Sequence, residues 1–309
     1  MRSLQGVETC LYLSVTALAC LALLSGVPDP PLALQVAALA FAVILFALPH
    51  GALDPLVARR TGIMALSGGF IAFHLAYGSV ALTVLGIWLA APGIPLAGFL
   101  AVSAYHFAGD WFQRGWALRL LLGGGVLGLP AIAHPEPTGS LYALLAGPSG
   151  IAVAQAQHDA AVLWLAILAA GVIMALFKRR GAAALELTMI TASGLILPPL
   201  VFFGLHFCLL HSPRHILCHW SVETQSAALA ATAALYTAIA VIAALMIAAF
   251  AAPLIASSSL SASGVPILES RAFQTLFIAL AALTAPHLIV TGLAEGATGE
   301  HRRMRATPG

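Results

Sequence analysis

Residues 204–219 read GLHFCLLHSPRHILCH and carry four of the eleven histidines of the chain within an otherwise apolar sequence. His211 and His215 are four positions apart, so on a helix their imidazoles project from one face, about one turn apart, where a single metal ion could bind both. Without a metal, two imidazoles on one buried face would each need a separate hydrogen-bond partner. The stretch therefore indicates half of a metal site within an apolar helix.

The composition around this stretch indicates a membrane protein. Of the 309 residues, 61% are hydrophobic and 8% are charged, whereas about 25% of the residues of a soluble domain are charged. Long apolar runs recur along the chain, which favours transmembrane helices over the alternating strands of a barrel. We expect an all-α, polytopic transmembrane helix bundle that forms a single integral membrane domain, residues 1–309. The net charge of +2 is too small to indicate nucleic-acid binding.

The apolar runs predict about ten spans. Residues 182–220 are apolar over about 57 Å of helix, while the hydrocarbon core of a bilayer is about 30 Å thick. Pro198-Pro199 divides this run in two, because proline lacks the N–H donor and clashes with the preceding turn. The spans are expected at about residues 10–26, 32–50, 63–91, 96–112, a run that ends near 133, 151–177, two within 182–220, 225–250 and 272–293.

The basic residues support the same number of spans. With ten spans, the basic residues near positions 2, 59–60, 114–119, 178–180 and 302–305 all fall on one side of the membrane, as the positive-inside rule requires. Nine spans would place the basic tail on the other side, although a re-entrant half-helix near the two prolines would mimic the tenth. We therefore expect a protein of the inner membrane with both termini in the cytoplasm.

Three pairs of ionisable residues with a spacing of four lie in the predicted spans, namely His50 with Asp54, His106 with Asp110, and His211 with His215. Ionisable side chains are costly in hydrocarbon and usually face a functional cavity. Neutral imidazole binds iron, zinc and copper, and a ligating histidine commonly donates its other N–H to a carboxylate. We expect the four histidines to hold one metal ion and the two aspartates to support them. In an alternative that ranks second, one aspartate binds the metal directly.

Other residues of the opening stretch are assigned supporting roles. His206 projects roughly 140° away from His211 on an ideal helix, so we expect it to lie behind the ligands or to line the cavity. Pro213 predicts a distorted helix. Arg214 needs an acidic partner or a position at the membrane interface. The acidic residues considered as its partners are Asp54, Asp110 and Glu223.

Two further groups complete the predicted site. His74, alone in its span, is interpreted as a hydrogen-bonded packing residue. Aromatic residues next to a metal in the membrane could line a tunnel for a long apolar substrate that enters from the bilayer. The residues assigned to this wall are Tyr105, Phe107, Trp111, Phe203 and Phe207.

Four motifs resemble, in the same order, those of the Brp/Blh family of bacterial β-carotene 15,15′-dioxygenases. They are Pro49-His-Gly-Ala-Leu-Asp54, Tyr105-His-Phe-Ala-Gly-Asp110, Phe207-Cys-Leu-Leu-His-Ser-Pro-Arg-His215 and Pro286-His287. The combination of the His-Ser-Pro-Arg-His box with the His-Gly-x-x-Asp box makes the resemblance specific, and it extends over about residues 40–290.

The resemblance implies a membrane enzyme that uses non-haem Fe²⁺ and O₂ to cleave the central double bond of β-carotene into two molecules of all-trans-retinal. It implies that the iron ligands are His50, His106, His211 and His215, and it places His287 near the cavity. His206 stands where the family commonly has an aromatic residue. A functional link to a rhodopsin would use the retinal.

Two other functions agree with part of the pattern. A membrane di-iron hydroxylase or desaturase also buries histidines, but such enzymes need several closely spaced histidine boxes and this chain has one clear box. A metal or proton transporter could carry histidines along its path. A metal count near two per chain would favour the first, and ion transport in liposomes without turnover of carotenoid would favour the second.

Overall fold

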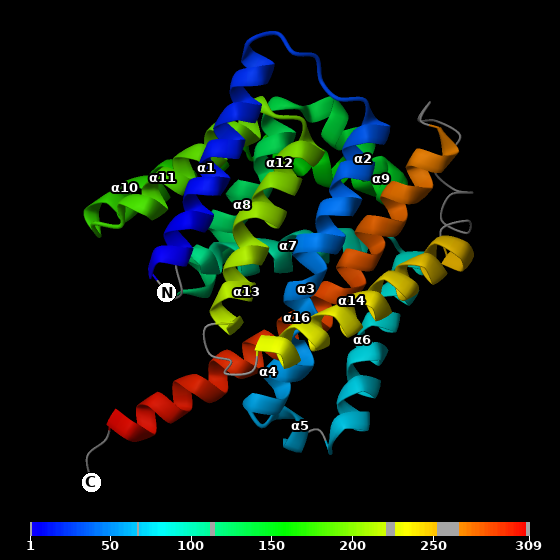
Figure 1. Ribbon diagram of the computed structural model, residues 1–309. Helices are drawn as coiled ribbons and strands as arrows, with labels where there is room; N and C mark the ends of the chain where they lie inside the picture. Colours follow the sequence, from blue (N-terminus) through cyan, green and yellow to red (C-terminus); the bar gives the residue numbers. More distant parts are fainter. Residues whose placement is uncertain (1, 67, 112–114, 221–225, 252–265, 307–309) are drawn as a thin grey trace.

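The computed structural model describes residues 2–66, 68–111, 115–220, 226–251 and 266–306, and within these ranges the chain forms helices and no strand (Figure 1). The all-α class predicted from the composition is confirmed. The elements in chain order are α1 (Arg2–Leu24), α2 (Leu32–Ala42), η1 (Val43–Ala47), α3 (Leu48–Gly51), α4 (Asp54–Arg60), α5 (Ile63–Leu66), α6 (Phe70–Ala90), α7 (Gly93–Phe107), η2 (Ala108–Asp110), α8 (Trp116–Ala133), α9 (Pro135–Asp159), α10 (Ala161–Phe177), α11 (Gly181–Ile196), α12 (Pro199–Leu205), η3 (His206–His211), α13 (Ser212–Trp220), α14 (Ser226–Met246), η4 (Ile247–Ala251) and α16 (Ile267–Ala306).

The number of spans is smaller than the ten predicted. In the part of the chain that the structure describes, seven helices are long and apolar enough to cross a membrane, and the bent pair α9 and α10 gives eight if it is counted as one span. With 15 and 16 residues, α7 and α11 are about 23 Å long and fall short of the roughly 30 Å hydrocarbon core. Apolar runs thus overestimate the spans because short helices are equally apolar.

Two predicted span boundaries are also corrected. The run 63–91 is interrupted between α5 and α6. Gly68 and Gly69 lie there with φ values of +79° and +105°, which residues other than glycine rarely adopt. The run 151–177 is divided at Ala160, where α9 and α10 meet at an angle of 57°. Polar residues from Gln155 to Asp159 lie just before this bend.

The break predicted at Pro198-Pro199 is confirmed. α11 ends at Ile196, Leu197 and Pro198 have extended backbone, and α12 begins at Pro199. Proline at the first helical position costs nothing, because its missing N–H would have no partner there. The histidine-bearing stretch therefore lies on a helical segment of its own, formed by α12, η3 and α13.

Two apolar cores meet at this segment. The first includes Leu39 of α2, Phe107 of α7, Phe207 of η3 and Phe273 of α16. The second joins α1, α8, α10 and α11, and Leu210 of η3 belongs to it. Side chains of η3 thus enter both cores, so this segment is fixed from two sides. In Figure 1, α16 passes along the segment from α2 to α4 and contacts α6 and α7, while α14 lies against α3 and α16.

Candidate metal centre

Five histidines from four parts of the chain converge inside the bundle. They are His50 of α3, His106 of α7, His211 at the end of η3, His215 of α13 and His287 of α16. The ring centroids of His106 and His211 are 4.7 Å apart, and so are those of His211 and His215. The four histidines predicted to act together do lie together, and His287 joins them.

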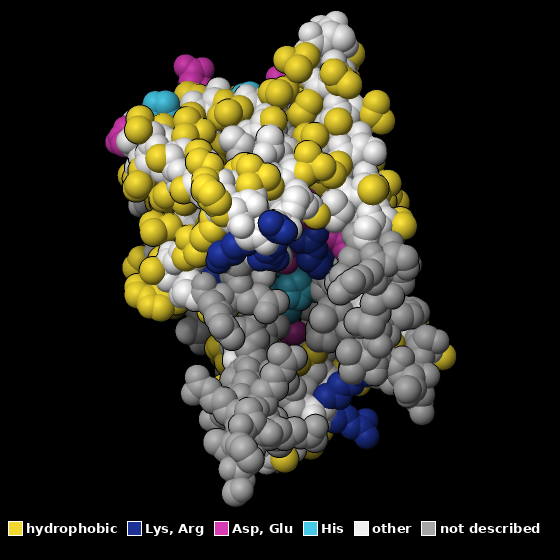
Figure 2. All heavy atoms as spheres, turned by 90° about the vertical axis from the view of Figure 1, so that its left-hand side faces the viewer, with side chains coloured by type: hydrophobic (Ala, Val, Ile, Leu, Met, Phe, Trp, Pro, Cys, Tyr) yellow, Lys and Arg dark blue, Asp and Glu magenta, His cyan; other side chains and the backbone are white. Residues whose placement is uncertain are grey.

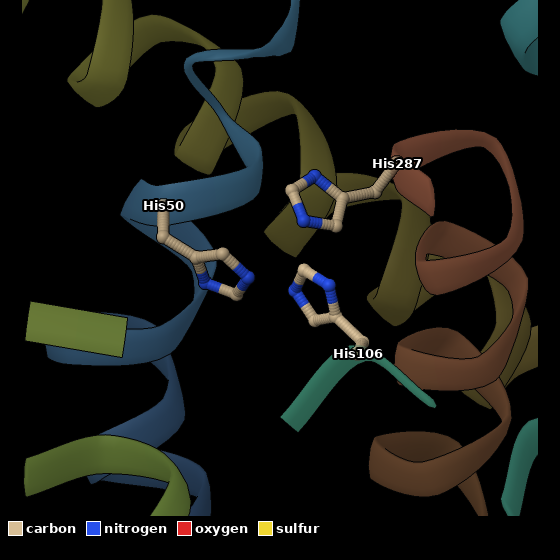
Figure 3. Close-up of side chains that lie close together, drawn as sticks. All are labelled: His50, His106 and His287. Atoms are coloured by element: carbon tan, nitrogen blue, oxygen red, sulfur yellow. The ribbon is translucent and has the colours of Figure 1, made fainter. Parts of the chain in front are cut away.

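Possible ligand atoms form two overlapping groups. In one group, nitrogen atoms of His50, His106 and His287 all lie within 4.8 Å of one another; in the other, those of His106, His211 and His215 do. Figure 3 shows the rings of the first group pointing toward one another from three different elements. Since His106 belongs to both groups, the five imidazoles form one continuous cluster.

Three buried imidazole nitrogens of the cluster have no hydrogen bond among the described residues. Within the described residues, Nε2 of His106, His211 and His287 is buried and has no hydrogen-bond partner. An unsatisfied buried polar atom costs about 1–3 kcal/mol, so three of them together need a common explanation. A cation that accepts neutral imidazole, such as iron, zinc or copper, fits this donor set.

Two aspartates hold two of these imidazoles from behind. His287 Nδ1 donates to Asp54 Oδ1 at 2.7 Å, and His211 Nδ1 donates to Asp110 Oδ2 at 3.0 Å. With its proton on Nδ1, each ring directs the lone pair of Nε2 to the centre. The spacing of four pairs each aspartate with a histidine of its own helix, but in the structure each aspartate bonds to a histidine of another helix.

Two π-helical turns lie next to the histidines of the cluster, one before His50 and one that ends at His211. η1 and η3 are π-helical, and each ends two residues before a proline, Pro49 and Pro213 respectively. Proline removes a backbone donor and crowds the preceding turn, and π-helical turns often occur at functional sites. The distorted helix predicted from Pro213 is confirmed. The π-helical turn of η1 leads to His50, whose Nδ1 donates to the carbonyl oxygen of Ala47.

An apolar cavity of about 410 Å³ opens beside the cluster and is lined by His50, His106 and His287. Its volume lies in the range of about 300–1,000 Å³ that is usual for small-molecule sites. Leu82 and Ile239 line it too and are themselves 68% and 49% exposed. The cavity therefore reaches the outer surface between α6 and α14.

Three of the five aromatic residues assigned to the cavity wall line it, namely Phe107, Phe203 and Phe207. The ring of Tyr105 lies under the guanidinium of Arg119 instead, 3.9 Å from its carbon to the ring centroid. Trp111 is buried and its Nε1 donates to Glu186 Oε2 at 2.8 Å. Tyr105 and Trp111 thus contact charged side chains and do not line the cavity.

His74 forms hydrogen bonds through both ring nitrogens, as the prediction of a packing residue requires. Nδ1 pairs with the carbonyl oxygen of Phe70 and Nε2 with the hydroxyl of Tyr236, each at 2.7 Å. His74 belongs to neither group of metal-binding atoms. It does line the cavity, together with Tyr236 of α14, which the sequence did not suggest.

His206 lies beside the centre but does not face it. Its ring is 1% exposed and lies nearly parallel to the rings of Trp111 and Phe202, with angles of 17° and 13°. It contacts Phe107, the ring centroids being 5.2 Å apart, and is absent from the cavity wall. Of the two predicted positions, the structure thus places His206 beside the histidine cluster and away from the cavity, and its role stays a prediction.

The partners of Arg214 differ from those considered. Its Nε donates to Glu8 Oε1 at 2.9 Å, and its Nη2 donates to Glu186 Oε1 at 2.8 Å, so within the described residues the ion pairs are with neither Asp54 nor Asp110. Glu223 lies outside the described residues. Figure 2 shows Lys and Arg side chains gathered on one face of the molecule, with a histidine side chain visible just below them.

A family model described as Beta-carotene 15,15'-dioxygenase matches residues 41–295, a range that contains all five histidines. The chain belongs to the β-carotene 15,15′-dioxygenase family. The resemblance inferred from the motifs is therefore confirmed, and the chain is an enzyme of this family. No solved structure is significantly similar to it.

Two relatives are similar over most of the chain. The "Beta-carotene 15,15'-dioxygenase" of an uncultured marine bacterium, 66A03, is 27% identical over 270 residues, which cover 80% of this chain and 90% of the relative. The "Probable beta-carotene 15,15'-dioxygenase Blh" of Halobacterium salinarum is 28% identical over 232 residues, which cover 65% of this chain and 66% of the relative.

Sequence reasoning missed several residues around the site of this dioxygenase-family enzyme. Tyr77 of α6 donates to Asp54 Oδ2 at 2.9 Å, and Glu8 and Glu186 bind Arg214. For Tyr77 and Glu186 their position within predicted spans was the available signal, because isolated ionisable groups in hydrocarbon need partners; Glu8 lies just before the first predicted span.

Proposed function

We propose that this enzyme cleaves the central 15,15′ double bond of β-carotene with O₂ to give two molecules of all-trans-retinal, and that His50, His106, His211 and His215 hold the Fe²⁺ it uses. The observation that carries the proposal is the meeting of these imidazoles beside an apolar cavity, whose wall includes His50 and His106, with Nε2 atoms of His106 and His211 that have no hydrogen-bond partner among the described residues. The names of both relatives agree with this substrate.

The overall reaction suits the residues around the cavity. One carbon–carbon double bond is broken, two carbonyl groups form, and both oxygen atoms of one O₂ are consumed without gain or loss of a proton. The bound iron would supply the activation of O₂. The protein then needs no general acid or base, and the two aspartates act by fixing the imidazoles of His287 and His211, a role typical of residues behind metal ligands.

The cavity wall also suits a hydrocarbon. β-Carotene offers no hydrogen-bonding group, and aromatic rings bind such a molecule by dispersion and by exclusion of water. Phe207 contacts His50 with ring centroids 5.8 Å apart, and Phe107 contacts His211 at 4.6 Å. A polyene that packs against these two rings lies next to the ligands. The opening between α6 and α14 would admit it from the lipid.

The same proposal places the enzyme in the inner membrane of a bacterium. Its substrate is dissolved in the bilayer, and its product, retinal, would be released there to a rhodopsin. The proposal thus includes Fe²⁺, O₂ and the link to a rhodopsin. The formation of retinal is what tests it.

The test is expression in a bacterial host that accumulates β-carotene, followed by chromatography of the pigments. We expect the carotene to bleach and retinal to appear, whereas His211→Ala, produced at the same level in the membrane, leaves the carotene intact. Unchanged carotene in the presence of folded, iron-loaded wild-type protein would refute the proposed substrate. Longer and shorter apocarotenals in place of retinal would refute cleavage at the central bond.

A further inference from the structure

We propose that His287 is a fifth protein ligand of the metal ion and that Asp54 orients it for this role. The inference rests on the proposed function and deepens it, because the motifs that carry the proposed ligand set supply only four histidines. It makes α16, the last described helix, part of the metal site.

The first observation is the position of His287. Its side chain is 7% exposed, and a nitrogen of its ring lies within 4.8 Å of nitrogens of both His50 and His106. The ring centroid of His287 lies 5.0 Å from that of His50 and 5.2 Å from that of His106. In Figure 3 the three rings point toward one another.

The second observation is the way in which its two nitrogens are used. Nδ1 donates to Asp54 at 2.7 Å, while the buried Nε2 has no partner among the described residues. His211 has the same arrangement, with Nδ1 bound to Asp110 and an unpartnered Nε2. A carboxylate behind the imidazole and a free nitrogen in front of it are typical of metal-ligating histidines.

A packing role explains His287 less well. His74 shows what a packing histidine looks like in this protein, since both of its nitrogens are hydrogen-bonded. Both oxygens of the Asp54 carboxylate accept a hydrogen bond, since Tyr77 donates to Oδ2 and His287 donates to Oδ1. Tyr77 of α6 and Asp54 of α4 thus fix the direction of the His287 ring. A packing role gives no function to its Nε2.

One ion explains the two overlapping groups better than two ions. The ring centroid of His50 lies 5.8 Å from that of His211 and 5.9 Å from that of His215, so the groups interleave. His106 is common to both. A neutral imidazole has one free lone pair, so His106 cannot serve two ions at once.

The test measures metal binding by the purified full-length protein in lipid nanodiscs, without carotenoid. Metal-free protein is titrated with Co²⁺, whose visible absorption depends on the number and kind of its ligands. We expect one ion per chain in the wild type. Asp54→Asn should weaken binding about 10–100-fold, the usual effect of losing a residue behind a metal ligand, and His287→Ala should weaken it further and change the Co²⁺ spectrum.

The matched control is His74→Ala, which removes a cavity-lining imidazole whose two nitrogens are already hydrogen-bonded; it should retain wild-type affinity and spectrum. Free imidazole should restore both in His287→Ala, which a packing role would not allow. If that variant does not fold, His287→Gln keeps a side chain that can donate to Asp54 and should still lose affinity.

Wild-type affinity and spectrum in the folded His287 variants would overturn the inference, as would two ions per wild-type chain. A wild-type protein that binds one ion in this way and yet forms no retinal would instead overturn the proposed function alone.

Discussion

Glu186 accepts four hydrogen bonds within the part of the chain that the structure describes. Its Oε1 accepts from Thr9 and Arg214, and its Oε2 accepts from Trp111 and Arg214. The side chain of Glu186 is 4% exposed and that of Arg214 is 19% exposed. This hub, the group of side chains hydrogen-bonded to Glu186, connects α1, α11 and α13. One of its donors, Trp111, directly follows Asp110, which accepts a hydrogen bond from His211.

We expect Glu186→Gln to lower the free energy of unfolding by about 1–3 kcal/mol, because the amide cannot accept from Arg214 through both of its end atoms and leaves Glu8 as the remaining anionic partner of the arginine. Denaturation of the purified protein in detergent, followed by circular dichroism, measures the change. The matched control is Glu136→Gln in the exposed first turn of α9, for which a change within about 0.5 kcal/mol is expected. Equal stability of both variants would show that the hub contributes little.

At the scale of single residues, the sequence predicts which histidines cluster but not which aspartate each of them is hydrogen-bonded to. Spacing and burial predicted that His50, His106, His211 and His215 would come together, and they do. Spacing could not show which aspartate supports which histidine, since the hydrogen bonds run between helices. His287 lacked a neighbouring histidine four positions away, so periodicity gave no sign of its place.

At the scale of elements, α7 and α8 approach so closely that one position tolerates no side chain. A Cβ at Gly123 of α8 would lie 1.8 Å from the carbonyl oxygen of Ala104 in α7. Ala104 precedes His106 by two residues, so the contact also fixes a proposed metal ligand.

Gly123→Ala is therefore expected to push α7 away from α8, lowering both the stability of the protein and its metal content. Overpacking of this kind typically costs about 1–3 kcal/mol. Gly98→Ala is the control within α7 itself, since a Cβ there meets nothing within 4 Å, and it should leave both quantities unchanged. Metal analysis and thermal denaturation of the two variants decide the matter. Wild-type values for Gly123→Ala would contradict the packing described.

Hydropathy predicted where the apolar elements lie and failed on how they cross the membrane. The break at Pro198-Pro199 followed from length and proline chemistry alone. The short helices α7 and α11 and the bend between α9 and α10 depend on packing against neighbours, which apolar composition does not encode. The location of both termini, argued from ten spans, remains a prediction.

At the scale of the whole molecule, the histidine cluster lies where two apolar cores meet, with different surroundings on its two sides. On one side is the apolar cavity that reaches the surface between α6 and α14. Behind the cluster lie Asp110, Glu186, Arg214 and Glu8. This separation suits the proposed uptake of an apolar substrate from the bilayer, while Asp110 holds the imidazole of His211 on the side away from the cavity.

The central claim is that the histidine cluster holds one metal ion that is required for carotenoid cleavage. The most direct test titrates metal-free protein with Fe²⁺ under anaerobic conditions and then measures retinal formed after β-carotene and O₂ are added. Retinal formation is expected to rise until one Fe²⁺ is present per chain and then to remain constant, with two retinal molecules for each β-carotene consumed. Undiminished cleavage by the metal-free protein, or a rise that continues to two ions per chain, would contradict the account.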